Sequence, residues 1–206
     1  MAKLYFKYGV MDSSKSAQAL ITKFNYEELG MTVWLIKPSI DTRDGADVVK
    51  SRIGLAATAR VITPEDDIIA EYRRAGKHDV IIADEAQFFT PAQIDQLRTL
   101  VDEDDLPVLC FGLRTDFLTH FFPGARRLME LADSLTEIKT VCACGRKATV
   151  NARIDERGRI TTEGSQVLLG GNDRYVAMCH KCWKEKIRQQ SRRETDCHAS
   201  VRTGSQ

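Results

Sequence analysis

Short apolar runs alternate with helical patterns over the first two-thirds of the chain. Strands are predicted at Leu4–Tyr8, Thr32–Lys37, Asp79–Ala83 and Pro107–Phe111. Helices are predicted over Ser16–Leu29, Glu65–Ala75 and Pro91–Val101, with Gly30, Pro64 and Thr90 as boundary residues. Strands that alternate with helices predict βαβ units and an α/β fold around a mainly parallel sheet.

The remaining segments lack this rhythm. Residues Asp41–Ala59 are rich in Asp, Gly, Arg and Thr without clear periodicity, so we expect a long functional loop. After about Lys139, Gly, Cys, Arg and Thr predominate. We therefore expect an α/β domain over 1–139, a small second domain over 140–190, and a disordered tail over 191–206, which has too few apolar residues for a core.

Composition and charge narrow the class of protein. The chain has 206 residues, of which 43% are hydrophobic, so a disordered polyelectrolyte is excluded. Thirty Lys and Arg against 29 Asp and Glu give a net charge of +1, which provides no overall field for nucleic acid or an anionic membrane. We find neither a membrane-length apolar run nor a signal-peptide pattern, and we expect a cytoplasmic protein.

A phosphate-binding loop is predicted between the first strand and the first helix. Its residues are Gly9, Val10, Met11, Asp12, Ser13, Ser14, Lys15 and Ser16. They fit G-x-x-x-x-G-K-[ST] at every fixed position except Ser14. Such a loop surrounds phosphates with backbone N–H groups, brings Lys15 to the β- and γ-phosphates, and offers the Ser16 hydroxyl to Mg²⁺. The alternative is an ordinary polar turn with an exposed lysine.

Ser14 replaces the last glycine of this motif. A helical backbone at this position would tolerate serine, whereas a positive φ or a very close phosphate would make serine unfavourable. We favour tolerance, because every other part of the motif is present.

Two acidic residues follow the predicted strand at Asp79–Ala83. Asp84 and Glu85 stand where a parallel sheet presents ligands, and the pattern is that of a Walker B strand. Asp84 could hold Mg²⁺, and Glu85 could accept a proton from an attacking hydroxyl or water. The alternative is a solvated acidic strand end.

Four of the six cysteines form two close pairs. Cys142 and Cys144 make one pair, and Cys179 and Cys182 make the other. In a cytosolic chain this spacing favours a metal over disulfides, and four thiolates can close a structural Zn²⁺ site. His180 could replace Cys182 as a ligand, but the C-x-x-C spacing is the better fit.

The order of motifs resembles a known family. After the phosphate loop come Asp41-Thr42-Arg43, Asp84-Glu85-Ala86-Gln87-Phe88-Phe89, Gly112-Leu113-Arg114-Thr115-Asp116-Phe117, the paired cysteines, and Gly170-Gly171-Asn172-Asp173-Arg174-Tyr175. From Leu4 to about Lys186 the chain is similar to the type II thymidine kinases, the zinc-containing cellular and bacterial class. The resemblance implies a RecA-like P-loop domain, a zinc-ribbon lasso domain, a homotetramer, and transfer of the ATP γ-phosphate to the 5′-hydroxyl of thymidine. Feedback inhibition by dTTP is left open.

The resemblance also implies roles for individual residues. The loop Gly9–Ser16 would bind the ATP phosphates with Mg²⁺ at Ser16 and Asp84, and Glu85 would be the general base. Arg43 falls in a lid-like loop, and Gln87 falls in a nucleotide-contacting segment. The remaining matches surround the thymine, either in the apolar pocket or on the lasso: Leu113, Phe117, Phe122, Leu168, Gly170 and Tyr175.

Simpler interpretations and a rival function remain open at this point. Phe117 and Phe122 could be core aromatics, Tyr175 could belong to the core of the second domain, and Arg43 and Arg114 could be surface charges. The rival is a RecA-like ATPase that binds nucleic acid through its zinc ribbon. It should show a basic stripe with interleaved aromatic residues, whereas the basic residues here are dispersed among acids.

Overall fold

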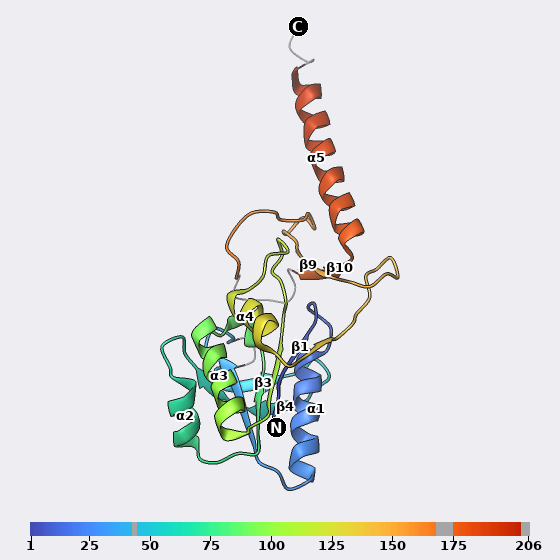
Figure 1. Ribbon diagram of the computed structural model, residues 1–206. Coiled ribbons are helices and arrows are strands. Elements are labelled where there is room, and N and C mark those ends of the chain that lie inside the picture. The colour runs from blue at the N-terminus through green and yellow to red at the C-terminus, as the bar shows by residue number, and fades with distance from the viewer. Residues whose placement is uncertain (43–44, 168–174, 203–206) are drawn as a thin grey trace.

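The computed structural model describes residues 1–42, 45–167 and 175–202, with side chains as far as residue 192. Its centre is a parallel sheet in the order β5-β2-β6-β7-β1-β8 (Figure 1). The strands of this sheet are β1 (Leu4–Tyr8), β2 (Val33–Pro38), β5 (Arg60–Ile62), β6 (Val80–Ala83), β7 (Val108–Gly112) and β8 (Ser134–Glu137). The predicted α/β fold with a mainly parallel sheet is confirmed.

Helices cover both faces of the sheet. Helix α1 (Lys15–Glu28) lies on one face, and α2 (Ile68–Ala75), α3 (Pro91–Asp104) and α4 (Pro123–Leu131) lie on the other (Figure 1). Alternate residues of β6 point to opposite faces: Ile81 packs with the core on the α2–α4 side, and Ile82 packs with the core on the α1 side. Burial on both faces explains why the central strands are continuous apolar runs.

Local capping signals fix where α2 and α3 begin. Thr90 accepts a hydrogen bond from Gln93 N, and Gln93 accepts one from Thr90 N, which together form a capping box at the start of α3. Helix α2 begins at Ile68 and not at the predicted Glu65, because Asp67 is the N-cap and accepts a hydrogen bond from Ala70 N. The short 3₁₀ helix η1 (Ala86–Phe88) follows β6 directly.

The predicted long loop contains regular structure. Strands β3 (Val48–Lys50) and β4 (Ala56–Thr58) pair antiparallel within it, so the expectation of an irregular loop over Asp41–Ala59 is wrong in this part. Strands of three residues are too short for an apolar alternation to be recognised in the sequence. We call residues 48–58 the hairpin.

The C-terminal unit, residues 140–202, contains antiparallel strands β9 (Val150–Arg153) and β10 (Tyr175–Met178) and helix α5 (His180–Arg202). The helix projects away from the rest of the molecule (Figure 1). A disordered tail was expected from residue 191, but the helix continues to Arg202. The run of mostly Lys, Arg, Glu and Gln over 184–194 favours a helical backbone without a core, and the helix continues beyond this run.

The division near residue 139 remains our proposal. It is supported by packing, because Ile138 packs with the α1-side core of the sheet, whereas Cys142 belongs to the apolar cluster of the C-terminal unit.

In the part of the chain that the structure describes, we find no helix both long enough and apolar enough to cross a bilayer.

Candidate active site

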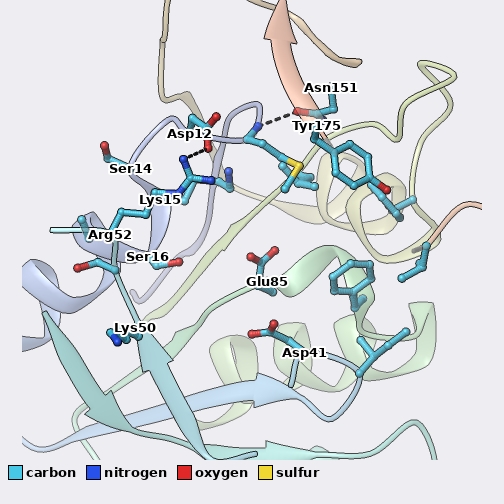
Figure 2. A pocket seen from close by; sticks show the side chains of 18 of the residues that line it. Asp12, Ser14, Lys15, Ser16, Asp41, Lys50, Arg52, Glu85, Asn151 and Tyr175 are labelled. Carbon is cyan, nitrogen blue, oxygen red and sulfur yellow. Dashed lines mark hydrogen bonds and ion pairs between the residues drawn. The ribbon is translucent and has the colours of Figure 1, made fainter. Parts of the chain in front are cut away.

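A cavity of about 640 Å³ opens at the carboxyl ends of the parallel strands. Its walls come from the phosphate loop, the hairpin with the residues before it, the segments after β6 and β7, and the C-terminal unit (Figure 2). This volume lies within the range of ligand sites, and the position is where open α/β sheets bind ligands. Its lining includes Met11, Asp12, Ser14, Lys15, Ser16, Asp41, Arg52, Glu85, Leu113, Asp116, Phe117, Phe122, Asn151, Gln166 and Tyr175.

The phosphate loop joins β1 to α1, as predicted. A Cβ at Gly9 would lie 2.4 Å from Ser13 Oγ and 2.6 Å from Ile138 O, so only glycine fits there. Lys15 is buried, and its Nζ donates to Val10 O over 2.8 Å. This hydrogen bond holds the ammonium group of Lys15 against the backbone of the loop. The N-terminus of α1 lies beside it, where anions are stabilised.

The backbone at Ser14 differs from the expectation. Its φ of 63° and ψ of 27° are left-handed. The expectation of a right-handed helical backbone, which would tolerate serine, is therefore wrong. The position has the geometry that glycine adopts without strain. The side chain of Ser14 is exposed and points away from the centre of the cavity (Figure 2).

Glu85 lies in the middle of the cavity wall. Its φ of 48° is left-handed, and this turn directs the side chain into the cavity (Figure 2). Gln87 Nε2 donates to Glu85 Oε2 over 2.6 Å, while Gln87 Oε1 accepts from Leu113 N over 2.9 Å. A Cβ at Gly112 would lie 2.6 Å from Gln87 Oε1, so the glycine leaves room for this amide. Gln87 is thus a positioning residue for Glu85.

Asp84 is buried behind Ser16. Burial, and next the carboxylate of Glu85, raise the pKa of Asp84 to about 7, and a hydrogen bond from Ser16 opposes this shift. Asp84 Oδ1 has no hydrogen-bond partner within the described residues. A buried carboxylate oxygen without a partner, next to a hydroxyl, fits the oxygen ligands that Mg²⁺ prefers.

Two ion pairs hold the segment before and within the hairpin. Lys37, fully buried at the end of β2, lies 3.2 Å from Asp41 and donates to Val48 O over 2.9 Å. Arg52 Nη1 lies 2.6 Å from Asp12 Oδ1, which joins the hairpin to the phosphate loop (Figure 2). The hairpin is therefore held directly against the phosphate loop at this side of the cavity.

Apolar and aromatic side chains line the other end of the cavity: Leu113, Phe117, Phe122 and Tyr175. Buried Arg153 supports two of them. Its guanidinium lies 3.7 Å from the centre of the Phe117 ring and donates to Tyr175 Oη over 2.8 and 3.0 Å. An aromatic face of this kind can stack a planar ligand.

Gln166 anchors the segment after β9 beside this aromatic end. Gln166 Nε2 donates to Asp116 Oδ2 over 3.0 Å, and Gln166 O accepts from Arg153 over 3.2 Å. Asp116 Oδ1 also accepts from the backbone N of Leu118 and His120, so it shapes the turn after Phe117.

The four paired cysteines come together, as the sequence predicts. The sulfur atoms of Cys142, Cys144, Cys179 and Cys182 all lie within 4.8 Å of one another, and Cys144 Sγ lies 3.7 Å from Cys179 Sγ. Zn–S bonds of about 2.3 Å in a tetrahedron separate the sulfurs by about 3.8 Å. Backbone N–H groups of Cys144 and Cys179 lower the pKa of Cys142 to about 6, which favours the thiolate that binds metal. The cluster can hold a metal ion.

The structure brings together most of the predicted site residues that it describes. The predicted site residues that are buried beside the cavity and do not line it are Gly9, Val10, Ser13, Asp84 and Gln87. Arg43, Leu168 and Gly170 lie outside the described residues. Sequence analysis missed Arg52, Asn151, Arg153 and Gln166, because single polar residues in segments without periodicity give no signal. The nearest prediction was the long functional loop over Asp41–Ala59, which contains Arg52.

Comparison with known proteins gives consistent results. The family model described as "Thymidine kinase" matches residues 2–183. The chain is 47% identical over 188 residues to a protein of Ruegeria pomeroyi named "Thymidine kinase", which covers 90% of this chain and 95% of the relative. It is 45% identical over 190 residues to a protein of Vibrio cholerae with the same name, covering 91% of this chain and 99% of the relative.

Proposed function

Because the chain belongs to the thymidine kinase family, we propose that it transfers the γ-phosphate of ATP to the 5′-hydroxyl of thymidine. One observation carries this proposal for the site itself: a single cavity joins the phosphate loop to a cluster of aromatic residues, with the Glu85 carboxylate between them. A donor phosphate at one end and a stacked base at the other would place the 5′-hydroxyl near Glu85.

In this mechanism the chain supplies positioning and charge. Backbone N–H groups of the phosphate loop and the ammonium group of Lys15 bind the phosphates. Glu85 accepts the proton of the 5′-hydroxyl as that oxygen attacks phosphorus, and Gln87 keeps the carboxylate in place. Mg²⁺, held at Ser16 and Asp84, would neutralise negative charge on the phosphates when bound.

The cysteine cluster is proposed to hold one structural Zn²⁺. All four ligands would be thiols. Four protein ligands complete a tetrahedral site, whereas a catalytic zinc keeps one coordination position open. The metal would join the turn at Cys142 to the start of α5, and so would stabilise a unit with a small apolar core.

A homotetramer is the proposed assembly. Large apolar side chains are exposed on α1, at Ile21 and Phe24, and on the edge strand β8, at Leu135. Apolar residues on two separate elements are suited to two kinds of subunit contact. Light scattering coupled to size-exclusion chromatography should give four times the mass of one chain.

We also propose dTTP as a feedback inhibitor. The same preparation can be assayed for inhibition by dTTP.

The decisive test is an assay of the purified protein with ATP, Mg²⁺ and each deoxynucleoside in turn, with the monophosphate as the readout. We expect phosphorylation of thymidine in preference to purine deoxynucleosides and deoxycytidine. ATP consumption that needs DNA or RNA and never occurs with thymidine would contradict the proposal and favour the nucleic-acid ATPase.

A further inference from the structure

Asn151, which the reaction scheme above does not use, joins three parts of the site. It is 2% exposed and lies on β9. Its Oδ1 accepts from Met11 N in the phosphate loop over 2.7 Å (Figure 2). Its Nδ2 donates to Thr115 O, after β7, over 2.8 Å. A backbone N–H can only donate and a carbonyl can only accept, so both ends of the amide are fixed.

The position of Asn151 depends on the cysteine cluster. In the β9–β10 ladder Asn151 pairs with Ala177, and Thr149 N donates to Met178 O over 2.8 Å. Cys179 follows Met178 directly, and Cys182 lies one turn into α5. A metal bound by these cysteines would therefore fix the end of β10, and through the ladder it would fix the strand that carries Asn151.

The residue before Met11 has a second link to the same unit. Val10 is 8% exposed and packs in the apolar cluster of the C-terminal unit, which includes Cys142, Met178 and Cys179. The carbonyl of Val10 also accepts the hydrogen bond from Lys15. Two successive residues of the phosphate loop are thus held by the C-terminal unit, one by packing and one by a hydrogen bond.

We infer that the C-terminal unit holds the phosphate loop in its binding conformation through Asn151 and Val10, so that metal binding at the cysteines and nucleotide binding at the loop stabilise each other. The inference rests on the proposed function in one respect, namely that the loop binds nucleotide phosphates. Coupling between binding free energies is reciprocal, so a bound nucleotide must strengthen metal binding by the same factor by which the metal strengthens nucleotide binding.

The wild-type protein tests this coupling without any substitution. The equilibrium affinity for Zn²⁺ is measured by competition with a zinc-selective chelator, with and without saturating ADP. ADP is the probe because it occupies the loop and does not react. We expect ADP to raise the zinc affinity by about fivefold or more. An equal zinc affinity in the two conditions, in a protein that binds ADP, would overturn the inference and leave the proposed function untouched.

Substitution of Asn151 then tests its part in the coupling. In Asn151→Ala we expect a full equivalent of zinc, weaker ADP binding, and a coupling factor well below that of the wild type, with the remainder carried by the packing of Val10. Gln190 is the matched control, because its amide also makes two hydrogen bonds within the C-terminal unit, both to the backbone of Ile160, with no contact to the phosphate loop. Gln190→Ala should keep the coupling factor of the wild type.

Two results would overturn the role of Asn151: an unchanged coupling factor in Asn151→Ala, or an equal loss of coupling in Gln190→Ala. The acceptor assay remains separate from this test. A protein that phosphorylates a nucleoside other than thymidine would fail the proposed function and would still show the coupling between ADP and zinc.

Discussion

Glu85 combines an uncommon backbone with a supported carboxylate. A left-handed φ is unusual for a residue with a long side chain, and it occurs here where the chain turns from β6 into η1. The turn brings the carboxylate into the cavity, and the amide of Gln87 restricts its orientation. Glu85 is therefore placed as a general base is expected to be, rather than as a solvated acid at a strand end.

We expect Glu85→Gln to lower the rate of phosphoryl transfer by about 10²–10⁴-fold and to leave the affinities for ATP and thymidine within several-fold. The substitution keeps the shape, and the Gln87 amide can still donate to the new amide oxygen. Single-turnover kinetics at saturating substrates measure the chemical step. Glu130→Gln, on the exposed surface of α4, is the control and should have the wild-type rate. An unchanged chemical step in Glu85→Gln would contradict the assignment.

Ser14 places a side chain on a left-handed backbone that glycine adopts more easily. Relief of this strain should stabilise the fold by about 1–2 kcal/mol, and the greater freedom of glycine in the unfolded chain offsets about 0.4–1 kcal/mol of it. We therefore expect Ser14→Gly to be neutral or to raise the free energy of unfolding by up to about 1.6 kcal/mol. Ser39→Gly, at a position without positive φ, should instead be destabilising. Denaturant unfolding measures both.

The affinity of the same Ser14→Gly variant for ADP separates backbone strain from obstruction. Because the Ser14 side chain points away from the cavity, we expect ADP affinity within about twofold of the wild type. A gain of tenfold or more would mean that the serine side chain obstructs the phosphates, and would contradict the geometry described here.

At the scale of elements, β9 supports the aromatic end of the cavity, where we propose that the nucleoside binds. Arg153 packs against Phe117, donates to Tyr175 and holds the carbonyl of Gln166. Arg153→Met keeps length and apolar contact but removes the charge and the donors. We expect the KM for thymidine to rise about tenfold or more, with a much smaller change in the KM for ATP.

Arg159→Met provides the control for that prediction, because Arg159 pairs with Asp155 in the turn after β9, on the same unit. It should leave both KM values near those of the wild type. Equal increases in the two KM values for Arg153→Met would show a general loss of structure and would contradict a specific role at the nucleoside end.

Elements with strong local signals could be predicted, and those fixed by tertiary contacts could not. Strand β1 and the cap of α3 match the prediction because an apolar run and a Thr-Pro start are local signals. The edge strand β8, with the polar sequence SLTE, and the short strand β5 gave no such signal. Helix α4 also went unassigned, although Pro123 stands at its first turn.

The same division applies to the site. The phosphate loop, the acids after β6 and the cysteine pairs are contiguous motifs whose chemistry can be read directly. Asn151 and Arg153 act from one short strand on segments far away in sequence, so only the fold connects them to the site. The left-handed backbone of Ser14 depended on the local geometry of the loop, and sequence alone supported the opposite interpretation.

On the scale of the whole molecule, the C-terminal unit lies over the carboxyl edge of the sheet, and its metal should affect one part of the protein first. We expect metal analysis of reduced protein to give about one zinc per chain. Chelation should increase proteolysis in residues 140–190 at concentrations that leave the α/β domain folded. Fully active protein without zinc would contradict a structural site.

Helix α5 extends beyond the contacts that join it to this unit. Ile187 packs against the apolar cluster and Gln190 bonds to the backbone of Ile160, whereas farther along the helix projects away from the body (Figure 1). We therefore expect a chain ending at residue 194 to keep wild-type turnover, zinc content and oligomeric state. A chain ending at residue 186 loses both contacts, and should bind zinc more weakly and lose thermal stability. Comparison of the two truncations by activity, metal analysis and light scattering separates the anchored part of the helix from its extension. Loss of activity or of the assembly in the longer truncation would contradict this division and assign a function to the projecting end.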